Sequence, residues 1–206
     1  MTKLLGSLLL TTLLLLAAGC VDLSRPALAK HYYLLNISPA AADPPPAHQA
    51  AIKVTGFEVA SPFADRSLVY RVDAERYEAD FYNEFFVIPR AMVTSKVVEW
   101  LSVRRVFVTT LPPSSSLDAP YAIEGLVTAM YGDLRDKAQP EAVFTMQVFV
   151  SQSGPLERSI VLERAYSHQV RVPDRSADAI SKGLSQAFQE CLVDLEADLR
   201  AMQMSP

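Results

Sequence analysis

The residues of this sequence that could do chemistry are carboxylates and histidines. Five acidic residues fall in one short stretch: Asp73, Glu75, Glu78, Asp80 and Glu84. A pair of carboxylates can perform general acid–base catalysis, but carboxylates that alternate along a strand usually form its solvated face. We therefore interpret this set as a polar strand face.

The histidines and glycines fit no catalytic or metal-binding motif. His31, His48 and His168 are far apart, and the sequence has no His-Glu-x-x-His and no Cys-x-x-Cys, so we expect no metal site. The nearest match to a nucleophile elbow, Gly183-Leu184-Ser185, lies inside a predicted helix rather than at a strand-to-helix turn. No glycines form GxxxxGK[ST] or GxGxxG. The sequence predicts neither an enzyme nor a nucleotide-binding protein, and no catalytic residues or cofactor.

The N-terminus has the layout of an export signal. Lys3 supplies a positive charge, and residues 4–18 are apolar except for Ser7, Thr11 and Thr12. This run is shorter than the roughly 20 residues that a membrane-spanning helix needs. We therefore predict that residues 1–19 are a cleaved signal peptide, with cleavage between Gly19 and Cys20.

The segment Leu16-Ala17-Ala18-Gly19-Cys20 resembles the lipobox of bacterial lipoproteins, although Ala17 stands where that family prefers Leu. The resemblance implies a covalent diacylglycerol on Cys20 and a lipidated tether over residues 20–30. Val21 follows the cysteine, whereas lipoproteins retained in the inner membrane usually have Asp there. This implies the periplasmic face of the outer membrane, and Asp22, one place later, keeps the inner membrane open as the alternative.

The other cysteine, Cys191, cannot form an internal disulfide if Cys20 carries lipid. We interpret it as a small buried residue on a helix. The alternative is a thiol that pairs between two chains.

Length and charge predict one folded domain over residues 31–206. The 206 residues are 50% hydrophobic and carry a net charge of −4, and removal of Lys3 with the signal would leave about −5. An acidic chain without a cluster of Lys and Arg lacks the electrostatic footprint of a nucleic-acid-binding protein.

Eight segments have the residue types or the alternation of β-strands. They are 31–35, 52–60, 68–72, 77–86, 103–110, 121–130, 142–152 and 159–172. Within 77–86, Tyr77, Ala79, Phe81 and Phe85 share one face, opposite the acidic residues. The last three segments read as successive antiparallel hairpins. Residues 38–50 and 111–120 are rich in proline and are predicted loops.

Two helices are predicted. Pro89 suits the first turn of a helix over 91–101. The C-terminal helix begins near Asp174 or Ser176, either of which can cap it. Its apolar residues recur at three- and four-residue steps: Ile180, Leu184, Phe188, Cys191, Leu192, Leu195 and Leu199. We expect this stripe to cover the sheet, with an oligomer seam as the alternative. The fold class is therefore α+β, a mostly antiparallel sheet covered by an internal helix and a long C-terminal amphipathic helix.

A family resemblance begins at Tyr32-Tyr33-Leu34-Leu35 and continues through Ile52-Lys53-Val54 and residues 63–71. It then runs through 77–86 to Pro89 and Trp100-Leu101. These segments are similar to the ABC-type transport auxiliary lipoproteins, the partners of MCE (mammalian cell entry) lipid transporters of the paraquat-inducible type. Phe86-Val87-Ile88 stands where that family often has Trp before the helix proline.

The resemblance implies a non-catalytic lipoprotein subunit that bridges a periplasmic phospholipid path to the outer membrane. Its partners would be an MCE-domain protein with an ABC permease and ATPase, and phospholipid as a further candidate; a homo-oligomer stays open. Two alternatives remain: an assembly or scaffold lipoprotein for another outer-membrane machine, and a carrier that holds phospholipid between sheet and helices. The sequence does not indicate partner-binding residues.

Overall fold

The computed structural model describes residues 29–40, 45–154 and 157–203. The predicted signal peptide and Cys20 lie outside these residues. In the described part, no helix has both the length and the apolarity needed to cross a bilayer.

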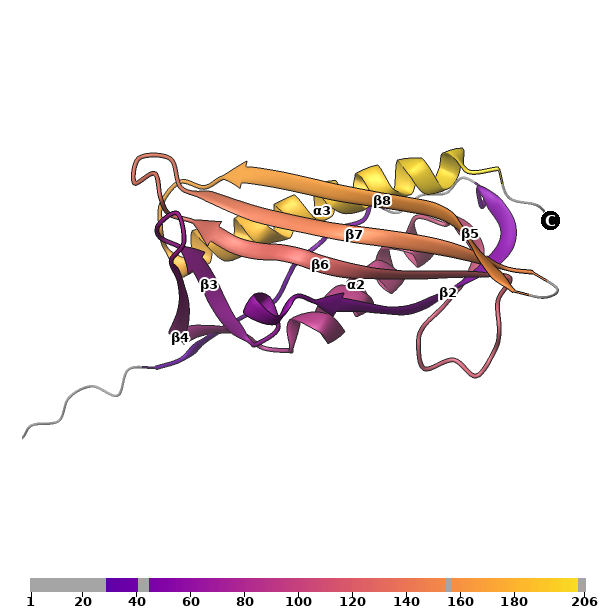
Figure 1. Ribbon diagram of the computed structural model, residues 1–206, viewed down its shortest axis with the longest axis horizontal. Helices are drawn as coiled ribbons and strands as arrows, with labels where there is room; N and C mark the ends of the chain where they lie inside the picture. Colours follow the sequence, from indigo (N-terminus) through magenta and orange to yellow (C-terminus); the bar gives the residue numbers. More distant parts are fainter. Residues whose placement is uncertain (1–28, 41–44, 155–156, 204–206) are drawn as a thin grey trace, which may run out of the picture.

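In the described residues, eight strands form one sheet with two α-helices against it (Figure 1). The strands are β1 His31–Tyr33, β2 His48–Val59, β3 Ser67–Arg71, β4 Tyr77–Phe85, β5 Phe107–Leu111, β6 Tyr121–Asp133, β7 Glu141–Ser153 and β8 Arg158–Arg171. The helices are α2 Pro89–Val103 and α3 Ala177–Ala201, with a 3-10 turn, η1, at Ser61–Phe63. The predicted α+β class is confirmed.

The long strands β6, β7 and β8 form the two predicted antiparallel hairpins, and β3 pairs antiparallel with β4. Most residue pairs of the sheet belong to these three ladders. The second edge of β6 is shared by β2 and β3, and both pair with it in parallel. The pairs β1–β4 and β2–β5 are also parallel.

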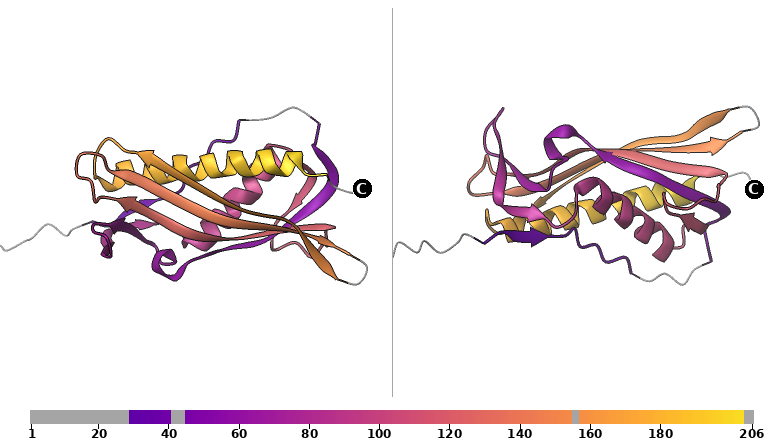
Figure 2. Two further views of the ribbon diagram at one scale, coloured as in Figure 1. Left: turned by 45° about the horizontal axis from the view of Figure 1, so that its top comes forward. Right: turned by 90° about the horizontal axis from the view of Figure 1, so that it is seen from below.

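Both helices lie on the same face of the sheet (Figure 2). Helix α3 packs on β6, β7 and β8, whereas α2 packs on β2 and β5. The predicted stripe of α3 is at most 1% exposed and contacts the inward residues of β7, which alternate as predicted. They are Phe144, Met146, Val148 and Val150. The prediction that the stripe covers the sheet is therefore confirmed, and these side chains fill the layer between sheet and α3.

Helix ends follow the predicted signals. Pro89 occupies the first turn of α2, where its missing N–H costs no hydrogen bond. At α3, the Ser176 hydroxyl accepts the N–H of Ala179 at 3.2 Å, and Asp174 in turn accepts the N–H of Ser176. Ser176 is thus the cap.

The starts of β2 and β5 each differ from the prediction by four residues. His48 to Ala50, expected in the proline-rich loop, already belong to β2, because the N–H of His48 donates to Val106 O at 3.1 Å and brings this end alongside β5. Val103, expected in a strand, ends α2. The chain turns at Arg105, whose φ is +50°, and β5 begins only at Phe107.

The predicted alternation of β4 breaks in its middle. The pairing with β3 shifts from Ser67–Glu84 to Val69–Ala79. At this irregularity the Asp80 carboxylate accepts the N–H groups of Tyr82 and Asn83, which bends the chain. As a result Phe81 is 68% exposed, whereas Glu84, expected on the solvated face, is buried.

Candidate functional site

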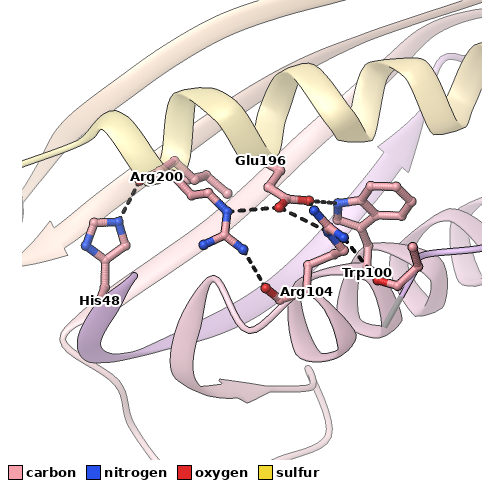
Figure 3. A network of polar contacts seen from close by, with 7 residues as sticks. His48, Trp100, Arg104, Glu196 and Arg200 are labelled. Carbon is pink, nitrogen blue, oxygen red and sulfur yellow. Dashed lines mark hydrogen bonds and ion pairs between the residues drawn. The ribbon is translucent and has the colours of Figure 1, made fainter. Parts of the chain in front are cut away.

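Glu196 of α3 is the centre of a polar cluster between the two helices (Figure 3). Its carboxylate accepts the indole N–H of Trp100 at 2.9 Å and the Nε–H of Arg104 at 2.8 Å. The Nε–H of Arg200 donates to the other oxygen at 2.9 Å. The outer donors of the arginines bind backbone: Arg104 donates to Ala40 O and Arg200 to Arg104 O.

Burial and hydrogen bonding have opposite effects on the pKa of Glu196. Burial by itself raises the pKa of Glu196, but the hydrogen bonds from Arg104 and Arg200 outweigh it and hold that pKa below its ordinary value. The carboxylate is therefore ionised and fully occupied. A carboxylate without free lone pairs is suited to joining elements, not to proton transfer.

Two of the three histidines, His48 and His168, have structural partners. His48 is buried against Phe107, and its Nε2–H donates to Leu199 O at 2.6 Å, which satisfies a carbonyl of the last turn of α3. His168 on β8 contacts Asp194 at 2.7 Å and Glu190 at 3.2 Å, both on α3. His31 is exposed at the start of β1. Over the described residues, no group of three His, Cys, Asp or Glu side chains is placed to hold a metal ion.

Cys191 is fully buried, and its Sγ lies 3.8 Å from Phe144 O. Burial, reinforced by the carboxylates of Asp194 and Glu190, raises the pKa of the thiol to about 12. The interpretation of Cys191 as a buried residue is confirmed. The residues of Gly183-Leu184-Ser185 are likewise buried in α3, and the Ser185 hydroxyl donates to Ser181 O, the backbone of its own helix.

The five acidic residues do not come together. Asp73, Glu75 and Glu78 are exposed, as predicted. The Asp80 carboxylate accepts a backbone N–H at the irregularity of β4. Glu84 is buried and forms ion pairs with Lys30 and Arg66. The interpretation as one solvated face is therefore wrong for Glu84, because the extra residues in β4 turn its side chain inward to meet these two cations.

A surface groove of about 490 Å³ runs beside α2, and we call it the α2 groove. One wall is the exposed side of α2, and the others are β2 at Thr55 and Gly56 and the segment after β5. The lining residues are Thr55, Gly56, Ile88, Arg90, Ala91, Thr94, Ser95, Val98, Pro112, Pro113 and Ser114. Apolar side chains, hydroxyls and the guanidinium of Arg90 line it, which suits a partner segment or an acyl chain rather than a reacting group.

The floor of this groove exists because β2 is irregular there. The register of β2 on β6 shifts between Val54 and Gly56, and Gly56 has a φ of +152° that a larger residue would strain to adopt. The shift leaves the N–H of Phe57 free to donate to the Thr94 hydroxyl of α2 at 2.9 Å. This bond ties the helix to the strand at the base of the groove.

A second surface feature is a set of exposed rings near the N-terminal end of the described chain. We call Tyr32, Phe81, Tyr82 and Phe86 the aromatic patch. The rings of Tyr32 and Phe86 meet edge-on with centroids 5.8 Å apart, and those of Phe81 and Tyr82 meet edge-on at 5.2 Å. Neither this patch nor the α2 groove was predicted from the sequence.

No family model and no curated protein matches this sequence. Solved structures match its fold. Protein XCC0632 from Xanthomonas campestris, described as a DUF330 family protein, superposes with a TM-score of 0.71 at 12% identity, over 81% of this chain and 92% of that one. An uncharacterized protein gives a TM-score of 0.65 at 16% identity, over 83% and 99% of the two chains.

A hypothetical protein from Chlamydia trachomatis gives a TM-score of 0.51 at 10% identity, over 73% of this chain and 98% of that one. At these identities the likeness concerns the fold alone. The chain therefore has the fold of a DUF330 family protein, present over almost the whole length of those structures.

Proposed function

We propose that this protein is a non-catalytic lipoprotein subunit of an ABC/MCE-type phospholipid transport system. Diacylglycerol on Cys20 tethers it to the periplasmic face of the outer membrane, where it meets an MCE-domain protein served by a separate permease and ATPase. Its own work is binding, since its polar clusters are engaged in holding the fold together.

The observation that carries this proposal is where the family-like segments lie in the fold. They supply the whole aromatic patch, and some of them lie in β2 and α2, the elements that border the α2 groove, although none of the lining residues of the groove belongs to them. The resemblance therefore covers elements that carry both exposed surfaces, and we assign the α2 groove to the contact with the MCE-domain protein.

Because the protein is tethered to the membrane, a shallow groove is sufficient to bind its partner. A groove of this size gives modest affinity by itself, but a membrane anchor raises the effective concentration of the two partners by orders of magnitude. Loss of the anchor should therefore impair transport even though the domain stays folded.

The test is co-purification from detergent-solubilised membranes with the mature, acylated chain as bait, followed by mass spectrometry. We expect recovery of an MCE-domain protein with its permease and ATPase. Recovery of other outer-membrane machinery without any of these subunits would reject the proposal in favour of the assembly or scaffold alternative.

A matched pair of variants tests the groove itself. Ser95 and Ser102 are both exposed on α2, but only Ser95 lines the groove. Ser95→Arg should abolish recovery of the MCE-domain protein and Ser102→Arg should preserve it. If both variants recover it equally, the contact lies elsewhere on the domain.

A further inference from the structure

The aromatic patch consists of two exposed ring pairs near Lys30. Phe81 is 68%, Phe86 63% and Tyr32 49% exposed. Lys30 joins its two ring pairs: its ammonium lies 4.6 Å from the centroid of the Phe81 ring, and two residues later Tyr32 packs on Phe86. Exposed rings that gather in one place mark an interaction surface.

One carboxylate and two cations lie beside the rings, so this group carries a net positive charge. The Lys30 ammonium is ion-paired with Glu84, and Arg66 also pairs with Glu84 at 3.3 Å. The Glu84 carboxylate itself is buried. The outer surface is therefore made of rings and tyrosine hydroxyls, with the partly exposed side chains of Lys30 and Arg66 beside them. Rings flanked by cationic side chains are the composition that favours the interface between water and lipid.

The position of the patch relative to the predicted lipid indicates what it faces. The described chain begins at residue 29, next to Lys30 and β1, at the end of the molecule where β3 and β4 lie (Figure 1). Cys20 is ten residues before Lys30, and ten residues span at most about 35 Å when fully extended. An acyl chain on Cys20 therefore keeps this end of the domain close to the bilayer.

The patch is too small for a stable interface between proteins. Its four side chains would bury 150–250 Å² each if covered completely, and part of that area is already buried, so about 450 Å² is available. A stable dimer buries about 800 Å² on each partner. A surface that only orients an already tethered domain does not need that area.

We propose that the aromatic patch rests on the surface of the phospholipid bilayer beside the lipid anchor. This inference builds on the proposed acylation of Cys20. Contact at this end directs the opposite end of the long axis, with the segment between β5 and β6, away from the membrane and into the periplasm (Figure 1).

Tryptophan fluorescence tests this orientation. The chain has a single tryptophan, Trp100, which is only 3% exposed. The mature chain, with its acylation verified by mass, is reconstituted into phosphatidylcholine vesicles with or without brominated acyl chains. The probes are Phe86→Trp in the patch and Leu117→Trp, a 64% exposed position in the distant segment between β5 and β6.

We expect brominated lipid to quench much of the additional emission of the F86W variant and to leave the L117W variant and the wild type unchanged. Absence of quenching in F86W, or equal quenching in F86W and L117W, would overturn the proposal. No other protein is present in the vesicles, so these outcomes do not depend on the proposed transport partners, and a chain found without lipid would count against the anchor instead.

Discussion

The indole N–H of Trp100 on α2 donates to the carboxylate of Glu196 on α3 at 2.9 Å, across 96 residues of sequence. The two helices pack mainly on different strands of the sheet, α2 on β2 and β5 and α3 on β6, β7 and β8. This bond, with those from Arg104 and Arg200, is therefore a direct link between the two halves of the helical layer.

Replacing Trp100 by Phe keeps most of the ring and removes the N–H. A hydrogen bond to a charged group contributes about 1.5–3 kcal/mol, so W100F should lower the free energy of unfolding by that amount in urea titrations. The control is Glu99→Gln, next along α2, which removes a partly exposed ion pair with Lys96 and should change the free energy of unfolding by less than about 1 kcal/mol. Equal changes in the free energy of unfolding for the two variants would show that the Trp100–Glu196 bond contributes no more than the Lys96–Glu99 ion pair.

The pKa of Glu196 gives its contribution a definite pH dependence. Because this pKa is lower in the folded chain than in the unfolded one, the folded state binds fewer protons. The stabilisation is fully present above about pH 4.5, the ordinary range for Glu, and is lost as pH falls through the lower folded value.

The variant that isolates this contribution is Glu196→Gln. At pH 7 it should be destabilised by about 3 kcal/mol, because it leaves two cations without their buried partner. The difference in unfolding free energy between wild type and variant should shrink as pH falls below 4.5. Other carboxylates with lowered pKa, among them Asp80 and Asp133, are present in both proteins, so their contributions to the pH dependence cancel in this difference. A difference that stays constant down to pH 3 would contradict the assignment.

Periodicity predicted the elements of this fold well, because most strands and α3 bury one face. Two such faces pack against each other in the core: the α3 stripe from Ile180 to Leu199 and the inward residues of β7 from Phe144 to Val150. What periodicity could not give was the pairing of strands that are not neighbours in the sequence. The parallel ladders of β6 with β2 and β3 depend on contacts between distant segments, for which the local sequence carries no signal.

The candidate surfaces were harder to predict for a related reason. The α2 groove depends on a register shift at Gly56, and the aromatic patch on an irregularity at Asp80. Each is one local departure from regular geometry that reorients its neighbours, so the pattern of 77–86 placed Glu84 on the wrong face. The Glu196 cluster joins residues that only the packing of α2 beside α3 brings together.

Because its thiol is buried, Cys191 should react slowly with thiol reagents. With its pKa raised to about 12, the thiol is almost entirely protonated at pH 8, and the thiolate is the reactive form. In the mature chain, native protein should titrate with close to no free thiol in Ellman's assay, and protein unfolded in guanidinium with one. A thiol that reacts fully in the native state would revive the interchain alternative.

Lipid attachment at Cys20 is tested by metabolic labelling with a fatty acid. Only this cysteine follows the small residues of the lipobox-like segment, so the wild type should be labelled, and Cys20→Ala should not. Cys191→Ala, which removes the buried thiol, serves as the control and should remain labelled. Label that persists in the Cys20 variant would reject the anchor and with it the proposed orientation at the membrane.

Two neighbouring residues of α3 distinguish a packed helix from an oligomer seam. Leu192 is fully buried and Val193 is 51% exposed, although both are aliphatic and adjacent on the same helix. An unpaired carboxylate in the core is strongly unfavourable, so Leu192→Asp should destabilise the domain by more than about 4 kcal/mol or unfold it. Val193→Asp adds the same charge in solvent and should melt within a few degrees of wild type.

The outcomes of this pair separate the two roles. If the stripe packs on the sheet, only the Leu192 variant loses its cooperative thermal transition in circular dichroism. If instead the Leu192 variant melts like wild type and changes its mass in light scattering, the stripe is a seam between chains. The full burial of the stripe against β7 leads us to expect the first result.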